Sequence, residues 1–123
     1  MSSFGDLTIQ STINGYKKKF FTCEEVTRYY TENIKKKKKL NCYITETPDL
    51  AINIARKIDK NLGNCPIKSM EGIPIAMKDL FCTKGIRTTA GSKILENFKP
   101  FYESTVSNNL WNSGAIMLGK SNL

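Results

Sequence analysis

The sequence predicts an α/β fold in which helices are followed by a βαβ unit of a larger mixed sheet. Apolar residues recur at helical spacing through residues 1–63, which indicates helices. Two short apolar runs, Ile73–Met77 and Ala115–Leu118, suit buried strands, and a helical pattern lies between them. Strand, helix and strand in this order predict two parallel neighbours in one sheet. Because a parallel sheet normally has more strands and cover on both faces, we expect residues 1–123 to be the amino-terminal part of a single larger domain.

The amino-terminal half begins with two predicted helices. Leu7–Tyr16 has a loose helical pattern, and Asp6 is available as its N-cap. Thr22 and Glu25 then form a capping box, which marks the start of a second helix. The side of the second helix that should pack against the protein holds Val26, Tyr29, Tyr30, Asn33 and Ile34.

A third helix follows a short extended piece at Leu40–Thr45. Thr47 is its expected N-cap, and Pro48 suits the first helical position. Asp49 adds a carboxylate in the first turn, and Gly63 ends the helix. The apolar positions at helical spacing are Leu50, Ile54, Ala55, Ile58 and Leu62.

The second half holds the elements of the βαβ unit. Residues 64–71 are a connection into the first apolar strand. A short helical turn comes after that strand, and then a helix that Ser104 or Thr105 can cap and that Gly114 ends. The range Gly119–Lys120 is expected to close the second strand. The residues that indicate the turn and the helix are Ile94, Leu95, Phe98, Val106, Leu110 and Trp111.

The composition is that of an ordinary soluble protein, with 40% hydrophobic and 24% charged residues. No apolar run is long enough to span a bilayer, and residues 1–10 lack the basic and apolar regions of a secretory signal, so we expect a cytoplasmic protein. Much of the net charge of +8 lies in Lys17–Lys19 and Lys35–Lys39, each near the end of a predicted helix, where cations are favoured. These lysines suit a solvated surface, and a weak phosphate-attracting surface is the alternative.

Histidine is absent, and the four cysteines are widely spaced. Without histidine the chain has no Ser-His-Asp or Cys-His arrangement of its own, and no mixed Cys/His metal site. The cysteines form no C-x-x-C pair, so no metal site is indicated and we expect reduced, mostly buried thiols. Proton transfer would fall to lysine, a carboxylate, cysteine or tyrosine. The cysteines are Cys23, Cys42, Cys65 and Cys82.

Lys78 is the leading candidate for a functional residue. It stands where the first apolar strand should end, and ligands gather at the carboxyl ends of strands in open α/β sheets. Asp79 follows at once, and then a loop with hydroxyls at Thr88 and Thr89 and a glycine at Gly91. Such a loop is typical of an active-site wall. A lysine can also end a strand simply because its charged head reaches into water.

The stretch GIPIAMKDLFCTKGIRTTAGSKIL, with the later AIMLGKSNL, resembles the amidase signature family. The match is specific, because G-I-P-I-A-x-K-D followed by T-K-G-I-x-T-T-x-G-S is far rarer than an apolar strand that ends in lysine. Within the family, the chain is most similar to the A subunits of tRNA-dependent glutamyl or aspartyl amidotransferases. The resemblance covers essentially the whole chain but only the amino-terminal part of the family's domain, with a helical part at 1–63 and the lysine strand and βαβ unit at 64–123.

The resemblance implies a catalytic Ser-Ser-Lys relay in which Lys78 is the terminal base. Its neutral amine would take the proton of a nucleophilic serine through a bridging serine, and the nucleophile would attack the side-chain amide of glutamine. Burial and nearby dipoles would have to lower the pKa of the lysine. The remaining loop residues would support the site by fixing and shaping the loop, and they are Asp79, Thr88, Thr89, Gly91 and Ser92.

The resemblance also implies partners. Ammonia would pass to a B subunit, which uses ATP and Mg to amidate misacylated tRNA, and a C subunit would complete the heterotrimer. We expect no cofactor or metal in this chain and no membrane contact. The family's serines lie in a Gly/Ser-rich stretch that this chain lacks after Lys78, so we expect it to be inactive alone. The alternatives are a non-catalytic remnant that binds tRNA or a partner subunit, and a fragment of a different amidase of the same family.

Overall fold

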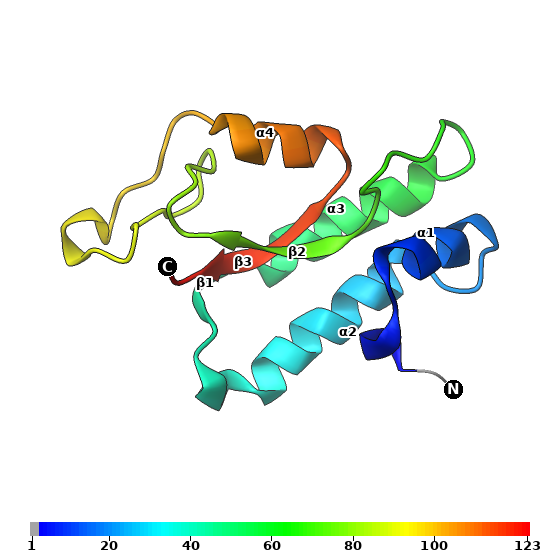
Figure 1. Cartoon of the computed structure of the whole chain (residues 1–123), viewed down its shortest axis with the longest axis horizontal. Coiled ribbons are helices and arrows are strands. Elements are labelled where there is room, and N and C mark those ends of the chain that lie inside the picture. The colour runs from blue at the N-terminus through cyan, green and yellow to red at the C-terminus, as the bar shows by residue number, and fades with distance from the viewer. Residues whose placement is uncertain (1–2) are drawn as a thin grey trace.

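A computed structural model describes residues 3–123 as a small mixed sheet with helices on both faces. The helices α2 and α3 lie along one face, α4 lies over the other, and α1 packs near the start of α2 (Figure 1). This confirms the predicted α/β class. Short 3-10 turns lie at Phe4–Asp6, Lys38–Leu40 and Lys93–Leu95. The main elements are α1 (Ile9–Lys17), α2 (Cys23–Lys36), β1 (Tyr43–Glu46), α3 (Pro48–Asn61), β2 (Pro74–Lys78), α4 (Thr105–Asn112) and β3 (Ile116–Ser121).

The sheet has the strand order β1-β3-β2. β2 and β3 are parallel neighbours joined through α4, which confirms the predicted βαβ unit, whereas β1 runs antiparallel to β3. The central strand is the most buried: Ile116 to Lys120 of β3 are all buried, whereas Met77 is the only buried residue of the edge strand β2. β3 also continues to Ser121, so the expectation that Gly119–Lys120 closes the strand was wrong, because both residues pair within it.

The core lies between β3 and the three amino-terminal helices. Ala51 and Ala55 are one helical turn apart on α3 and have no exposed surface. Their small side chains let the α3 backbone approach the central strand closely, and α3 contacts β3 more extensively than α2 does. Leu50, expected on the same apolar face, is 38% exposed. The buried apolar cluster consists of Tyr16, Cys23, Val26, Ala51, Ala55, Ile116 and Leu118.

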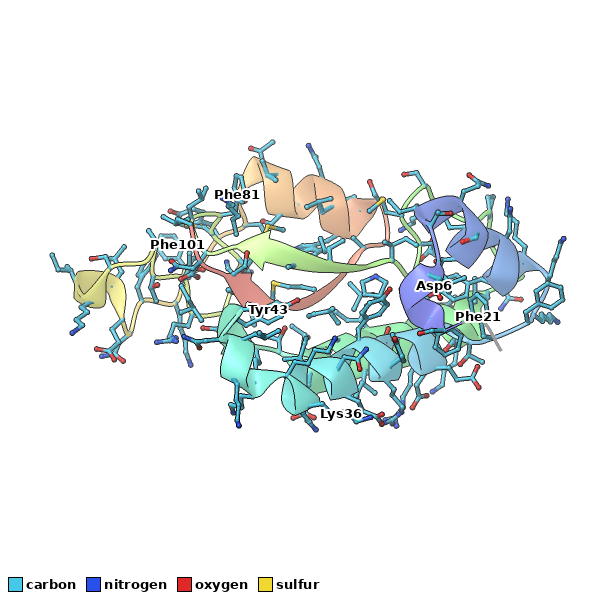
Figure 2. The ribbon with its side chains drawn as sticks, turned by 60° about the horizontal axis from the view of Figure 1, so that its bottom comes forward. Asp6, Phe21, Lys36, Tyr43, Phe81 and Phe101 are labelled. Carbon is cyan, nitrogen blue, oxygen red and sulfur yellow. The ribbon has the colours of Figure 1, made fainter. Side chains whose placement is uncertain are left out.

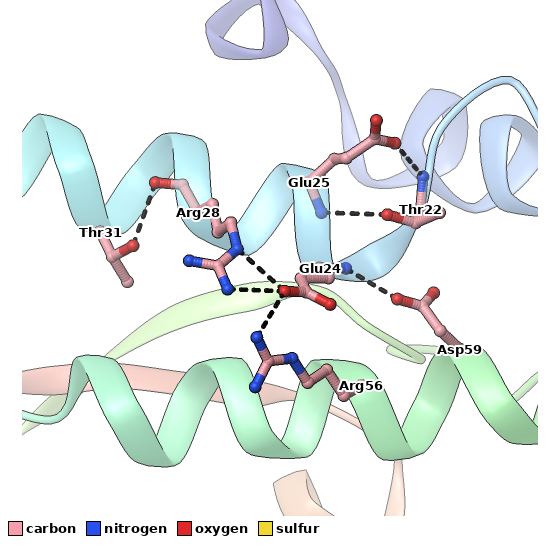
Figure 3. A network of polar contacts seen from close by, with 7 residues as sticks. All are labelled: Thr22, Glu24, Glu25, Arg28, Thr31, Arg56 and Asp59. Carbon is pink, nitrogen blue, oxygen red and sulfur yellow. Dashed lines mark hydrogen bonds and ion pairs between the residues drawn. The ribbon is translucent and has the colours of Figure 1, made fainter.

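Local capping explains where the helices begin. Thr22 and Glu25 form the predicted capping box at the start of α2, in which the Glu25 N–H donates to Thr22 Oγ1 at 3.1 Å and the Thr22 N–H to Glu25 Oε2 at 2.7 Å (Figure 3). The predicted cap of α1 was wrong: Thr8 caps it, and Asp6 lies in the 3-10 turn before it. Thr47 stands at the predicted N-cap of α3 but makes no capping bond, because its hydroxyl donates to a carbonyl of β3.

Asp59 of α3 gives α2 a second cap from outside the helix. Its two carboxylate oxygens accept the N–H groups of Cys23 at 2.8 Å and Glu24 at 2.9 Å, which no residue within α2 satisfies. Figure 3 shows the bond from Glu24. Beside it, the Glu24 carboxylate pairs with Arg28 at 2.7 Å and with Arg56 of α3 at 3.0 Å. The two long helices are therefore joined by charge-assisted contacts near the start of α2.

The expectation that the cysteines are mostly buried was wrong. All four are free thiols, but only Cys23 is buried; Cys42 and Cys65 are exposed and Cys82 is partly exposed, because these three lie in connections rather than in core elements. The two lysine clusters are exposed, as predicted for solvated helix ends. Over residues 3–123, no helix has the length and apolar character needed to cross a membrane.

Candidate functional site

Lys78 is the last residue of β2, at the carboxyl end of the parallel pair. Met77 before it is buried and Lys78 is exposed, since successive side chains of a strand point to opposite faces. The structure places the residue at the predicted edge of the sheet. It does not show the burial that a neutral amine would need, because no part of residues 3–123 covers this side chain. The catalytic role of Lys78 stays a prediction.

A tight turn fixes the backbone of Lys78. The Phe81 N–H donates to the Lys78 carbonyl at 3.1 Å, and the Asp79 N–H donates to the Ser121 carbonyl of β3 at 2.9 Å. The first bond closes the turn that leaves β2, and the second continues the ladder between β2 and β3 by one residue. Lys78 thus projects from a backbone that is held on both sides.

Asp79 organises the far side of the loop. Its side chain is fully buried, and its Oδ2 accepts hydrogen bonds from the Thr89 hydroxyl and from the Thr89 N–H at 3.1 Å. The Asp79 carbonyl also accepts the Ala90 N–H at 2.9 Å, and the Gly91 N–H donates to Thr89 Oγ1 at 3.2 Å. Ala90 and Gly91 both have positive φ, 50° and 69°, so the chain reverses sharply here. Oδ1 of Asp79 has no hydrogen-bond partner within the described part of the chain.

Ser92 and Arg87 hold the outer part of the loop. The Ser92 hydroxyl accepts the Ile94 N–H at 3.3 Å and so begins the 3-10 turn that follows. The Arg87 guanidinium donates to the Ile44 carbonyl at 2.9 Å and to Thr45 Oγ1 at 3.1 Å, which ties the loop to β1. A shallow hollow of about 220 Å³ lies here. It is lined by Ile44, Arg87, Thr89, Gly91, Ser92, Lys93, Glu96 and Asn122.

Lys120 is the charged residue that the sequence analysis missed. It lies within β3 beside Met77 and has no exposed surface. Its amine donates to the Phe81 carbonyl at 2.6 Å, to Thr83 Oγ1 at 2.9 Å and to Thr88 Oγ1 at 3.1 Å. Burial lowers the pKa of this amine, and the negative charge of Asp79 partly opposes that shift.

The structure therefore divides the predicted loop residues between two buried centres. Thr89 and Gly91 gather around Asp79, whereas Thr88 belongs to the amine of Lys120. No local pattern in the sequence marks Lys120 as buried, because its three acceptors lie 32 to 39 positions earlier in the chain. No group of three or more His, Cys, Asp or Glu side chains that could hold a metal occurs in residues 3–123.

Of the two lysines at this end of the sheet, Lys78 has an amine that solvent can reach, and Lys120 does not. Lys78 makes no side-chain hydrogen bond or ion pair inside the described range, whereas Lys120 has three acceptors and no access to solvent. An exposed amine at the carboxyl edge of a parallel pair, next to a loop held by buried polar groups, is accessible to a group presented to that edge.

Comparison with known proteins agrees with this geometry. Residues 25–123 match the protein family described as Amidase. The chain is 51% identical over 121 residues to the A subunit of the glutamyl-tRNA(Gln) amidotransferase of Caulobacter vibrioides, covering 98% of this chain and 25% of that protein. It is 45% identical over 123 residues to the same subunit of Methylorubrum populi, covering 100% of this chain and 25% of that protein. The chain thus spans about a quarter of the length of the curated relatives it matches.

Solved structures share the same arrangement of elements. A peptide amidase from Stenotrophomonas maltophilia superposes with a TM-score of 0.89 at 24% identity, over 98% of this chain and 25% of that chain. An amidase family protein from Bacillus anthracis superposes with a TM-score of 0.88 at 26% identity, over 96% of this chain and 24% of that chain. The described elements are therefore those of the corresponding quarter of these larger folds.

Proposed function

The chain belongs to the amidase family, and on that premise we propose that it is the amino-terminal part of the glutamine-hydrolysing subunit of a tRNA-dependent amidotransferase. Identity of 45–51% over essentially the whole chain with subunits of this kind supports the choice over other amidases, whose solved structures are about 24–26% identical. A different amidase of the same family is the alternative within the class.

The position of Lys78 carries the mechanistic part of the proposal. Its exposed amine stands at the carboxyl edge of β2, where a segment from outside residues 1–123 can cover it. In the proposed reaction, the neutral amine accepts the proton of a nucleophilic serine through a bridging serine, and the nucleophile attacks the glutamine amide. The proton then returns along the same path to the amide nitrogen, so the C–N bond breaks, ammonia leaves and an acyl-enzyme forms. Both serines belong to the segment that covers the edge. The chain by itself therefore hydrolyses no glutamine.

The remainder of the proposed reaction belongs to partner subunits in the cytoplasm. Ammonia passes to a B subunit, which uses ATP and Mg to convert misacylated Glu-tRNA(Gln) or Asp-tRNA(Asn), and a C subunit completes the complex. The present chain would contribute no residue to ATP binding, because its part is the supply of ammonia.

A second candidate function rests on the exposed lysines. Lys35–Lys39 lie where α2 ends and the chain turns towards β1, and they form an exposed basic surface that could contact tRNA phosphates without any catalysis. A salt series of tRNA binding to the purified chain tests this. A steep fall in affinity with salt would support it, and no binding at low salt would remove it.

A chimera tests the amidase proposal directly. Residues 1–123 replace the matching quarter of the A subunit from Caulobacter vibrioides, the complex is assembled, and glutamine-dependent ammonia release is measured. We expect an active chimera in which Lys78→Met lowers kcat by about 10³-fold, in the range seen when a general base is removed.

Lys84→Met is the matched control, because Lys84 lies in the following loop, carries the same charge and is exposed. It should leave kcat within about twofold, since its side chain is in solvent. An active chimera in which Lys78→Met has no more effect than Lys84→Met would contradict the proposed role. Ammonia release by the isolated chain would contradict the need for an outside nucleophile.

A further inference from the structure

The proposed Ser-Ser-Lys relay assigns no role to Lys120, a buried charged residue. Lys120 lies in the central strand with no exposed surface, and a lysine is almost never fully buried unless its ammonium is paired. Here the three acceptors are neutral: the Phe81 carbonyl and the hydroxyls of Thr83 and Thr88, at 2.6, 2.9 and 3.1 Å. An ammonium has three N–H groups, so every donor is used.

All three acceptors lie in the loop that follows Lys78. Phe81 is the direct link, because its carbonyl accepts from Lys120 while its N–H donates to the Lys78 carbonyl at 3.1 Å. Figure 2 shows Phe81 at the end of the sheet where this loop leaves β2. The contacts therefore run from the buried ammonium through one residue to the backbone of the candidate base.

The two hydroxyl acceptors extend the same hold along the loop. Thr88 accepts from Lys120 and donates to the Ile86 carbonyl at 3.1 Å, and its oxygen lies 3.4 Å from that of Thr83. Lys120 thus binds both ends of residues 81–88 at once. Without it, a partly buried carbonyl and two buried hydroxyls lose a donor, and such groups regain one most easily by opening to water.

We propose that Lys120 is a positioning residue for Lys78: its buried amine gathers residues 81–88 against β3 and so fixes the turn from which Lys78 projects. This inference rests on the proposed function for the task of Lys78. The order of the loop itself is a separate property, and it can be measured whether or not the chimera is active.

The energetics separate this role from simple stabilisation. A buried charge is costly, so an apolar side chain of the same length can replace it with little change in global stability. Lys120→Met keeps the stem and removes the donors. We therefore expect the loop to loosen while the rest of the fold holds. The charged or titratable groups that act on the amine are Asp79, Cys82 and Glu103.

Hydrogen exchange followed by mass spectrometry on the whole chain tests this. In Lys120→Met, amides of residues 81–90 should exchange about tenfold faster, as expected for the loss of one or two net hydrogen bonds, while peptides of α2 and α3 change by about twofold or less. Lys84→Met removes the same charge from an exposed position in this loop and should leave both regions unchanged. An unchanged loop, or equal acceleration in all peptides, overturns the inference.

The pH dependence of hydrogen exchange in the loop separates a role of the Lys120 amine from a role of its aliphatic stem. Because burial lowers the pKa of Lys120 below 10.5, the closed loop binds fewer protons than the open loop just below that pH. Protection of the loop, corrected for intrinsic exchange, should therefore rise with pH towards 10.5 in the wild type and stay flat in Lys120→Met. If the Lys120 side chain only filled space, loop protection would have the same pH dependence in the wild type and in Lys120→Met, and that result would overturn the inference.

Two further measurements keep the inference decidable. If Lys120→Met does not fold, Thr83→Val removes one acceptor and should still speed loop exchange by about threefold; no change there would overturn the inference. In an active chimera, Lys120→Met should lower kcat by about tenfold and leave KM for glutamine within about twofold. An unchanged kcat would refute the positioning role alone, whereas an inactive parent chimera would count against the proposed function and leave the exchange result standing.

Discussion

Asp59→Ala should destabilise the fold through the start of α2, although Asp59 lies in α3. The Asp59 carboxylate accepts the N–H groups of Cys23 at 2.8 Å and Glu24 at 2.9 Å. A bond to a charged acceptor is worth about 1.5–3 kcal/mol, and loss of a helix N-cap costs about 0.5–2 kcal/mol. Cys23 is fully buried, whereas Glu24 is partly exposed and water can replace its bond. We therefore expect the free energy of unfolding to fall by about 2–3 kcal/mol.

Urea unfolding at neutral pH, followed by far-ultraviolet circular dichroism, measures this loss. Asp49→Ala is the matched control, because Asp49 is an exposed carboxylate in the first turn of the same helix, where only the helix dipole favours it, by about 0.5 kcal/mol. Asp59→Asn keeps one acceptor oxygen and should lose about half as much as the alanine variant. A loss below about 1 kcal/mol in Asp59→Ala, or a loss no larger than that of Asp49→Ala, would refute the argument that this carboxylate caps α2.

Two other changes follow from the packing around Cys23. Gly72 has φ of 72°, and a Cβ there would lie 2.7 Å from Cys23 Sγ and 2.8 Å from a ring carbon of Tyr16. Gly72→Ala should therefore lower the free energy of unfolding in urea by about 3 kcal/mol. The control is Gly63→Ala, where φ is 93° but the space is open, and it should lower the free energy by about 1 kcal/mol. Burial raises the pKa of the Cys23 thiol to about 12, so at about pH 8 a thiol reagent should label Cys42 and Cys65 at once and Cys23 only on unfolding. Since the unfolded thiol has a pKa near 9.0, its contribution to stability is complete below pH 9.0 and is lost as pH rises towards 12; Cys23→Ala should lack this part of the pH dependence, and an identical slope in both proteins would contradict it.

The elements that depend on neighbouring residues were predictable from the sequence. The capping box of Thr22 and Glu25 lies within four residues, and the structure has it as expected. The parallel pairing of β2 and β3 also followed from local signals, because strand, helix and strand leave few other arrangements. Thr47 shows the limit of such signals, since its hydroxyl donates to a carbonyl of β3, 70 residues away, and not to any acceptor in its own helix.

The features that the sequence did not reveal depend on residues far apart in the chain. Asp59 caps a helix whose first residues lie 35 and 36 positions earlier, and no local pattern announces that contact. Lys120 had the same difficulty: a Gly-Lys pair at the end of an apolar run is typical of a strand that reaches solvent, and burial became visible only with the loop of residues 81–88 in place. Sequence patterns locate elements well, whereas the partners of buried polar groups are fixed by the assembled fold.

The two lysines at the end of this sheet have opposite surroundings, and the roles proposed for them depend on that difference. The amine of Lys120 is buried and donates to the Phe81 carbonyl and to the hydroxyls of Thr83 and Thr88. Such a group is held too completely to exchange protons with a substrate. Lys78 makes no side-chain hydrogen bond in residues 3–123, so its amine is accessible to a group brought to the carboxyl edge. The proposed base must be free at its nitrogen and fixed at its backbone, and the role proposed for Lys120 is to fix that backbone.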